Sequence, residues 1–182
     1  MRQWLRKLLV VALNLSSHQT KTRFGGFLFM ACNMAFYCSL SFLMKYLHTM
    51  VRVSDLETSL TFYRDALGLE VVKTKDVPQG RFTLVFLAAP GDSSAQIELT
   101  YNWDEQGYTG GRNFGHLAYQ VNDIYAACER LQSFGVTIAR PPRDGYMAFV
   151  RSPDGISIEL LQRGEPLPPQ SPWVDMPNVG SW

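Results

Sequence analysis

The stretch QIELTYNW, residues 96–103, alternates like a β-strand but places Glu98 between two aliphatic residues. A second stretch, ISIELL at residues 156–161, places Glu159 in the same setting. Glutamate is disfavoured in strands and costly to bury, so packing alone explains neither residue. The recurrence of Ile-Glu-Leu indicates two related halves in which each glutamate has a specific task.

The elements expected around these two stretches follow the same order twice. Each half begins with a strand, continues with a helix that ends at a glycine, and finishes with three further strands. Ser54 and Glu57 have the spacing of a capping box at the start of the first helix. The expected strands cover residues 46–53, 69–75, 82–88, 96–103, 115–121, 136–140, 146–151 and 156–162, with a loop, APGDSS, at 89–94 and the second helix at 123–134. Such an internal repeat predicts an α+β fold of two tandem βαβββ modules that form a curved mixed sheet.

The pattern along the chain separates three parts. We expect the functional domain to cover residues 44–163, with modules at about 45–103 and 113–162. The tail at 164–182 is rich in proline and has no hydrophobic period, so we expect an extended surface segment without chemistry. Residues 1–43 form an N-terminal extension that the repeat does not explain.

This extension differs in kind from the rest of the chain. The first acidic residue is Asp55, and residues 24–44 carry no charge. As a helix this stretch would be long enough to cross a bilayer, although Asn33 and several small residues weaken that interpretation. Three alternatives remain open: a segment outside the functional domain that reflects a misassigned start upstream of Met44, a membrane anchor, or a basic targeting segment.

The composition of the 182 residues narrows the class of protein. A hydrophobic content of 46% and a charged content of 18% are typical of a globular domain. The net charge of +1, without a long basic run in the body of the chain, provides no electrostatic surface for nucleic acid. Three cysteines without a Cys-x-x-Cys pair indicate neither a disulfide framework nor structural zinc, so we expect a reducing, cytoplasmic location.

Some polar residues occupy corresponding positions in both halves of the repeat. Superposing the halves places His48 on His116 and Glu98 on Glu159. If the two units pack about a pseudo-two-fold axis into one curved sheet, their inward faces bring these four side chains to a common centre. Two imidazoles and two carboxylates suit a divalent first-row metal with two positions open for water or substrate. Each residue alone could belong to an ordinary strand or a solvent face, but their recurrence in both halves favours a metal site.

Further polar and apolar residues are expected around this centre. Arg52 and Asn102 follow the histidine and the glutamate of the first half by four residues, so they share the same strand faces. Together with Arg112 they suggest an anionic ligand held through its carboxylates, because guanidinium matches carboxylate in bidentate geometry. Met147 and Phe149 share one face of their strand and are candidates either for an apolar pocket wall or for core packing.

Four stretches in this order resemble glyoxalase I, the lactoylglutathione lyase family of the vicinal-oxygen-chelate superfamily. The likeness covers about residues 44–163 and rests on LHTMVRV, IELTYNW, FGHLAYQV and SPDGISIELL. The resemblance implies one divalent metal per site, with Ni(II) favoured over Zn(II) or Co(II), and glutathione as cosubstrate. It places the metal ligands at His48, Glu98, His116 and Glu159, and the contacts to glutathione at Arg52, Asn102 and Arg112.

The reaction implied by this resemblance starts from the hemithioacetal of methylglyoxal and glutathione. The product is S-lactoylglutathione, formed through a metal-stabilised enediolate, and the reaction detoxifies methylglyoxal. Glu159 is the expected base that moves a proton between adjacent carbons, while Glu98 is chiefly a metal ligand. The family also implies a homodimer whose sites form between subunits, joining His48 and Glu98 of one chain to His116 and Glu159 of the other.

The sequence departs from some relatives in the region from Gly135 to Phe149, which is short. A lysine-containing loop that closes over glutathione has no counterpart there, and Arg140 and Arg143 are the candidates to replace it. Two other functions share the repeat: an extradiol dioxygenase and a metal-free small-molecule-binding module. A fourth ligand at Glu98 argues against the dioxygenase, and the paired histidines would have no purpose in the binding module.

Overall fold

The computed structural model of the chain describes residues 45–111 and 113–181. The N-terminal extension, its uncharged stretch at 24–44 and Arg112 therefore lie outside the described residues. Among the described residues, no helix combines the length and the apolar character needed to cross a membrane.

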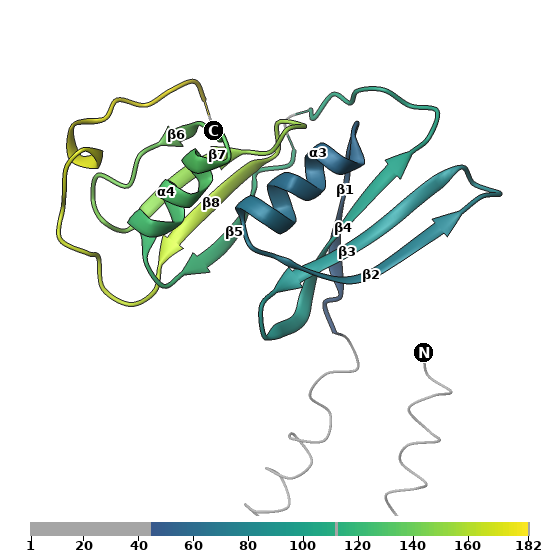
Figure 1. The fold of residues 1–182 in the computed structure, drawn as a ribbon, viewed down its shortest axis with the longest axis horizontal. Coiled ribbons are helices and arrows are strands. Elements are labelled where there is room, and N and C mark those ends of the chain that lie inside the picture. The colour runs from purple at the N-terminus through teal and green to yellow at the C-terminus, as the bar shows by residue number, and fades with distance from the viewer. Residues whose placement is uncertain (1–44, 112, 182) are drawn as a thin grey trace, which may run out of the picture. The chain divides into compact units, whose positions relative to one another are not determined.

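The first module contains four strands and one helical segment. β1 (His48–Arg52) is followed by α3 (Leu56–Leu60), which continues as the π-helix η1 (Thr61–Ala66), and then by β2 (Glu70–Val77), β3 (Phe82–Ala89) and β4 (Asp92–Asn102). These strands form a sheet in the order β1-β4-β3-β2. β1 runs parallel to β4, and the other pairs are antiparallel. Figure 1 shows this module in blue and teal.

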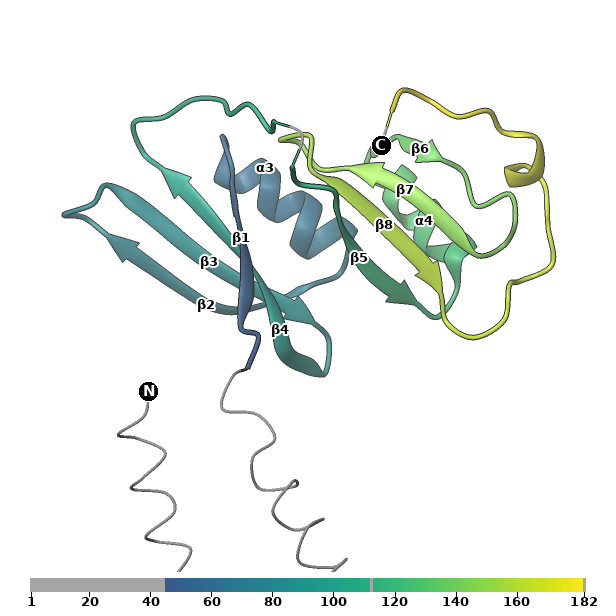
Figure 2. The same ribbon diagram turned by 180° about the vertical axis from the view of Figure 1, so that it is seen from behind.

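The second module repeats this arrangement. It consists of β5 (His116–Val121), α4 (Ile124–Ser133), β6 (Ile138–Arg140), β7 (Met147–Arg151) and β8 (Ser157–Gln162). Its sheet has the order β5-β8-β7-β6, with β5 parallel to β8. The predicted α+β fold of two βαβββ modules is confirmed, and the eight strands form one four-stranded sheet per module (Figure 2).

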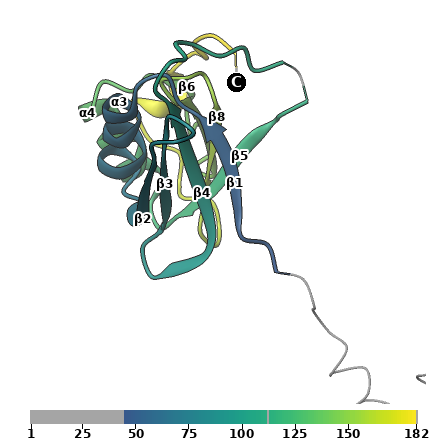
Figure 3. The same cartoon turned by 90° about the vertical axis from the view of Figure 1, so that its right-hand side faces the viewer.

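Alternation along the central strands gives each sheet a core face and an open face. In β4, Ile97 and Leu99 are buried, so Glu98 between them must lie on the opposite face. In β8, Ile158 and Leu160 have the same relation to the intervening glutamate. The helices lie on one side of the strands (Figure 3), and the term open face is used here for the other side. Both Ile-Glu-Leu repeats therefore direct apolar residues to the core and glutamates away from it.

The first helix does not begin with the predicted capping box. Asp55 is the N-cap, in an extended conformation, and its carboxylate accepts a hydrogen bond from the Thr58 amide at 2.7 Å. The capping box was the wrong prediction because the Ser54 hydroxyl donates instead to Asp154, at 2.6 Å. Asp123 caps α4 in the corresponding way, so the repeat extends to the helix starts.

The predicted loop at residues 89–94 is shorter in the structure. β4 begins at Asp92, which pairs with Ala89 of β3 after a register shift. The chain reverses at Pro90 and Gly91, and Gly91 has a φ of +75°, which glycine adopts without steric cost. A tight hairpin therefore replaces the loop.

The C-terminal tail packs specifically on the second module instead of forming a loose extended segment. Trp173, in the short 3₁₀-helix η2 (Trp173–Asp175), is only 1% exposed and stacks on Tyr125 of α4 with ring centroids 6.4 Å apart. The Tyr125 hydroxyl donates to the Pro168 carbonyl at 3.1 Å. Figure 1 shows the tail in yellow, running around the second module. Most of the tail is exposed and irregular, and the one buried aromatic residue that anchors it could not be foreseen from the composition.

Backbone contacts fasten the tail at two further points. The Leu167 amide donates to the Gly145 carbonyl at 3.0 Å, and the Val179 amide donates to the Ala139 carbonyl at 2.8 Å. Gly145 has a φ of +67°, and a Cβ atom there would lie 1.9 Å from the Leu167 carbonyl oxygen. Only glycine therefore allows the tail to approach this turn.

Candidate functional site

The first His-Glu pair lies on the open face of the first module. His48 begins β1 and Glu98 lies in the middle of β4, with His48 Nε2 2.8 Å from Glu98 Oε2. The imidazole also meets the edge of the Phe86 ring, at 5.5 Å between centroids and 76° between planes. The side chains of His48 and Glu98 are 37% and 12% exposed, so the carboxylate is shielded while the imidazole remains accessible.

The second module repeats this pair in nearly the same geometry. His116 Nε2 lies 3.1 Å from Glu159 Oε2, with exposed fractions of 44% and 15%. The His116 ring meets Phe149 at 5.6 Å and 88°. Phe149 is paired in register with Glu159, as Phe86 is with Glu98. Each module thus holds one histidine, one glutamate and one phenylalanine in equivalent places.

The structure does not gather the four predicted ligands within one chain. Among the described residues, no group of three or more His, Cys, Asp or Glu side chains is close enough together to hold a metal ion. The strands form two four-stranded sheets, each with its own pair, and the meeting of the two pairs between subunits remains a prediction. Each pair nevertheless presents one imidazole nitrogen and one carboxylate oxygen at contact distance, which is half of an N₂O₂ donor set.

The two glutamates differ in how firmly they are held. Glu98 Oε1 accepts a hydrogen bond from the Thr100 hydroxyl at 3.3 Å. The residue two positions after Glu159 is Leu161, whose side chain has no donor. The Glu98 carboxylate is therefore held by a hydroxyl on its own strand, whereas Glu159 lacks an equivalent donor at that position.

Arg52 lines a hollow whose other polar residues, Glu105 and Tyr108, are in contact with Asn102. Arg52, at the end of β1, lines a hollow of about 650 Å³ together with Glu105 and Tyr108. Asn102, at the end of β4, donates from Nδ2 to Glu105 Oε2 at 2.8 Å and to the Tyr108 hydroxyl at 3.2 Å. Arg112, predicted to join them, lies outside the described residues.

Met147 and Phe149 lie two residues apart on β7. Phe149 is almost completely buried and lines a second hollow of about 540 Å³ beside His116. Met147 is half-buried and pairs in register with Leu161. Phe149 thus packs against the sheet and also borders the second hollow, and its contact with a substrate remains a prediction.

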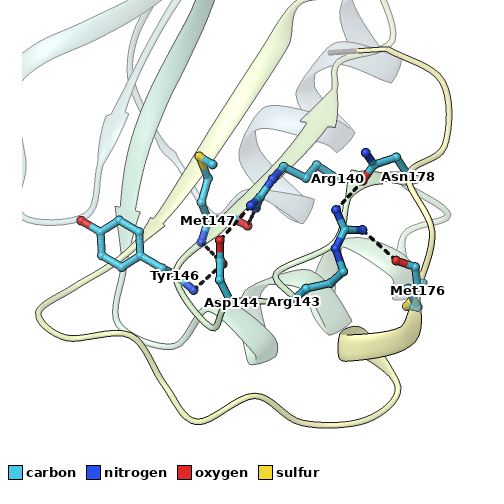
Figure 4. A network of polar contacts seen from close by, with 7 residues as sticks. All are labelled: Arg140, Arg143, Asp144, Tyr146, Met147, Met176 and Asn178. Carbon is cyan, nitrogen blue, oxygen red and sulfur yellow. Dashed lines mark hydrogen bonds and ion pairs between the residues drawn. The ribbon is translucent and has the colours of Figure 1, made fainter.

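Arg140 and Arg143 are both engaged within the second module, as Figure 4 shows. Arg140 donates to the Met147 carbonyl oxygen and, at 2.8 Å, to Asp144 Oδ2. Burial alone would raise the pKa of Asp144, but the hydrogen bonds from Arg140 and from two backbone amides hold that pKa below its usual value. These contacts leave Arg140 a structural residue and do not support its predicted role in place of the missing lysine.

Arg143 is occupied by the tail. Its guanidinium donates to the Met176 carbonyl oxygen and to Asn178 Oδ1, both at 2.8 Å (Figure 4). The guanidinium of Arg143, which the sequence suggested as a ligand-binding group, is therefore hydrogen-bonded to the tail. These contacts do not support a ligand role for Arg143, and the packing of residues 164–181 could not be foreseen from their composition.

Sequence reasoning missed Phe86, Glu105 and Tyr108. Phe86 could have been found from strand register, because it lies opposite Glu98 as Phe149 lies opposite Glu159. Glu105 and Tyr108 lie in a non-periodic segment after β4, where the sequence carries no comparable signal.

The sequence is similar to a known protein family and to curated proteins. The model of the Glyoxalase/Bleomycin resistance protein/Dioxygenase superfamily matches residues 45–160. A lactoylglutathione lyase of Neisseria meningitidis is 44% identical over 126 residues, which cover 66% of this chain and 91% of that protein. A probable lactoylglutathione lyase of Synechocystis sp. is 46% identical over 122 residues, covering 64% and 93%.

A solved structure shows a similar arrangement of elements. The trypanothione-dependent glyoxalase I of Leishmania major superposes with a TM-score of 0.61 and 38% sequence identity. The match covers 65% of this chain and 86% of the Leishmania chain. The similarity therefore includes most of the described residues.

Proposed function

Because this chain belongs to the Glyoxalase/Bleomycin resistance protein/Dioxygenase superfamily, we propose that it is a lactoylglutathione lyase. It converts the hemithioacetal of methylglyoxal and glutathione into S-lactoylglutathione and thereby removes methylglyoxal. The observation that carries this proposal is the repeated pair of His48 with Glu98 and His116 with Glu159, at 2.8 and 3.1 Å. The names of relatives that are 44% and 46% identical support it.

The chemistry of the donor set fits a divalent metal ion. Neutral imidazole and carboxylate are ligands shared by nickel, zinc and cobalt, and we favour Ni(II), with Zn(II) or Co(II) as alternatives. His48, Glu98, His116 and Glu159 would hold the ion. Bound there, it would supply Lewis-acid stabilisation to the substrate oxygens beside the carbon that loses its proton.

The distribution of the donors supports a homodimer with shared sites. Each sheet carries one His-Glu pair, and the pairs do not meet among the described residues of one chain. A second copy could complete the set by placing His48 and Glu98 of one subunit against His116 and Glu159 of the other, which is a self-complementary two-fold interface. Each dimer then holds two equivalent sites.

The two glutamates take different roles in proton transfer. Glu159 is the base that removes the proton from the carbon beside the carbonyl and returns it to the neighbouring carbon. His116 orients its carboxylate, and Phe149 restricts access of water from the side of β7. Glu98, held by the Thr100 hydroxyl, remains chiefly a ligand. A mobile base opposite a fixed ligand suits a reaction in which one proton moves between adjacent atoms.

The substrate is held outside the metal centre by the hollow around Arg52. Arg52 and Asn102 bind polar groups of glutathione, and Arg112 is expected to contribute a second guanidinium. Phe149 and, at the start of β7, Met147 form the apolar side of the site. Glutathione carries two carboxylates, which matches an arginine-containing hollow.

Thioester formation from methylglyoxal and glutathione is the direct test of this function. Protein stripped of metal should be inactive, and addition of nickel, cobalt or zinc in turn should restore activity, most strongly with nickel. Bound metal should reach one ion per complete site in the same samples. Absence of thioester with every divalent ion tested would rule out the proposed function.

Shared sites can be tested separately by mixing two inactive variants. His48→Ala and His116→Ala should each be inactive as homodimers, because every site lacks one ligand. A mixed dimer places both defects in one site and leaves the other intact, so unfolding and refolding together should restore about a quarter of wild-type activity. No recovery, with mixed dimers shown by mass spectrometry, would mean that the four ligands do not come from two chains in this way.

A further inference from the structure

The hollow around Arg52 contains a carboxylate that binding of an anionic ligand does not explain. Its lining includes Arg52, Glu105, Tyr108 and Asp154. A site that holds only the carboxylates of its ligand gains nothing from an acidic side chain, since like charges repel. The presence of Glu105 therefore points to a positive group on the ligand.

The two carboxylates of the hollow are used differently. Asp154 accepts hydrogen bonds from the Ser54 amide and hydroxyl, at 2.9 and 2.6 Å, and from the Ser59 hydroxyl at 3.3 Å. These bonds join the two modules and engage both oxygens of the Asp154 carboxylate. Glu105 is exposed and is fixed through Oε2 by the Asn102 amide, so its other oxygen can meet a ligand.

Arg52 is the complementary charge. Within the described parts of the chain, no hydrogen bond or ion pair links its guanidinium to another residue. It lies close enough to Tyr108 that its positive charge acts to lower the pKa of that hydroxyl. Glu105 acts on the same hydroxyl in the opposite sense, and burial is the largest of the effects that leave the Tyr108 pKa raised. Arg52, Glu105 and Tyr108 therefore line the same hollow close enough together for both charges to act on one hydroxyl.

A cation and an anion that line one hollow complement a group that carries both charges. The γ-glutamyl end of glutathione is such a group, with an α-carboxylate and an α-ammonium on one carbon. We propose that Glu105 is a specificity-determining residue that binds this α-ammonium while Arg52 binds the α-carboxylate. The Asn102 amide holds the Glu105 carboxylate in place and also donates to the Tyr108 hydroxyl. This inference rests on the proposed function and restricts the substrate to thiols with a free amino-acid head.

A pair of thiols that differ only in the amino group tests this directly. Glutathione is compared with glutaryl-cysteinyl-glycine, in which hydrogen replaces the α-ammonium and all else is retained. Each hemithioacetal is assayed with the metal-loaded wild type, Glu105→Gln and the control Glu165→Gln, an exposed glutamate of the tail. Glu105→Gln keeps the shape and the bond from Asn102 but removes the charge.

The wild type and the control should prefer glutathione by about tenfold in kcat/KM, mainly through KM, as expected for a partly solvated charge pair. Glu105→Gln should lose this preference because its activity falls with glutathione and not with the glutaryl thiol. An equal fall with both thiols, or a preference that survives the substitution, would overturn the proposal.

Direct binding separates failure of this inference from failure of the proposed function. S-methylglutathione and its glutaryl counterpart are titrated into the same three proteins by calorimetry. One possible outcome is that no protein forms thioester, but the wild type and the control bind S-methylglutathione more tightly than its glutaryl counterpart while Glu105→Gln binds the two equally. In that case the head-group site is supported and the proposed reaction is not. If the wild type binds both ligands equally or neither, the head-group site is wrong, whatever the result of the activity assay.

Discussion

The two modules hold the same His-Glu pair in nearly the same geometry but differ in what surrounds it. Beside the first pair, the strand ends at Asn102 and opens onto the hollow with Arg52 and Glu105. Beside the second pair, the arginines of the turn before β7 are bound to the module itself and to the tail. Strand register fixes the His-Glu pair in both modules, whereas the residues around the pair differ between them. The arginine near the first pair has no such partner among the described residues, whereas those near the second pair are already bound within the protein.

The largest expected effect is a difference in turnover between substitutions of the two glutamates. Glu159→Gln should reduce turnover of the metal-loaded enzyme by about 10²- to 10⁴-fold, because the amide cannot accept the substrate proton. Glu98→Gln should also reduce turnover, but less, since the fixed carboxylate acts mainly as a ligand. Rates of thioester formation, normalised to bound metal, give the comparison.

Bound metal must be measured for both variants, because loss of the ion would mimic loss of the base. If Glu159→Gln retains its metal and works at a near-normal rate, Glu159 is not the base. If Glu98→Gln is the slower of the two at equal metal content, the assignment of roles must be reversed.

The next effect concerns the tail, which only the second module has. Trp173→Ala should lower the free energy of unfolding by about 3–5 kcal/mol, because a fully buried indole leaves a cavity against Tyr125. Val174→Ala, at an exposed neighbouring position, is the matched control and should have little effect. Urea unfolding followed by circular dichroism measures both. A loss of less than about 1 kcal/mol for Trp173→Ala would show that the tail is dispensable for stability.

A smaller effect is expected at the junction between the modules. Ser54→Ala removes a 2.6 Å hydrogen bond to the Asp154 carboxylate, which should cost about 1–2 kcal/mol in unfolding free energy. Ser93→Ala, on the exposed start of β4, serves as control in the same denaturation assay. Equal stability of the two variants would mean that this bond does not hold the modules together.

The smallest effect is expected at the start of the first helix, where the contribution of Asp55 to stability should depend on pH. The hydrogen bonds from Thr58 lower the pKa of Asp55 below 3.8, so this carboxylate stabilises the folded state above that pH and loses its contribution as the pH falls through its folded pKa. Asp55→Asn should therefore lower the urea midpoint slightly at neutral pH and less in acid. Asp175→Asn controls for the loss of one negative charge. If the difference in urea midpoint between the wild type and Asp55→Asn grows as the pH is lowered, Asp55 does not act as a charged cap.

The fold and the His-Glu pairs could be predicted because both depend on local alternation and on its repetition. Glu98 and Glu159 are conspicuous in apolar strands, and the order of elements around them is the same twice. Strand spacing also indicated that Arg52 and Asn102 share the strand faces of His48 and Glu98. These features need only the period of two residues that every strand imposes.

The remaining features depend on contacts between distant parts of the chain. Ser54 has the local sequence of a cap, but Asp154, one hundred residues away, engages its hydroxyl. Arg143 is polar and suits a ligand, yet the tail provides its partners in Met176 and Asn178. No local pattern distinguishes a free charge from one that a later segment will neutralise.

The burial of Trp173 has a spectroscopic consequence. The described residues contain two tryptophans: Trp103, half-buried at the end of the first module, and Trp173, sealed against the second. Indole emission shifts to longer wavelength when water reaches the ring, so Trp173 emits at the blue end until the tail detaches. Each module thus contains its own fluorophore, and in a chain whose other two tryptophans are replaced, the loosening of one module could be distinguished optically from that of the other.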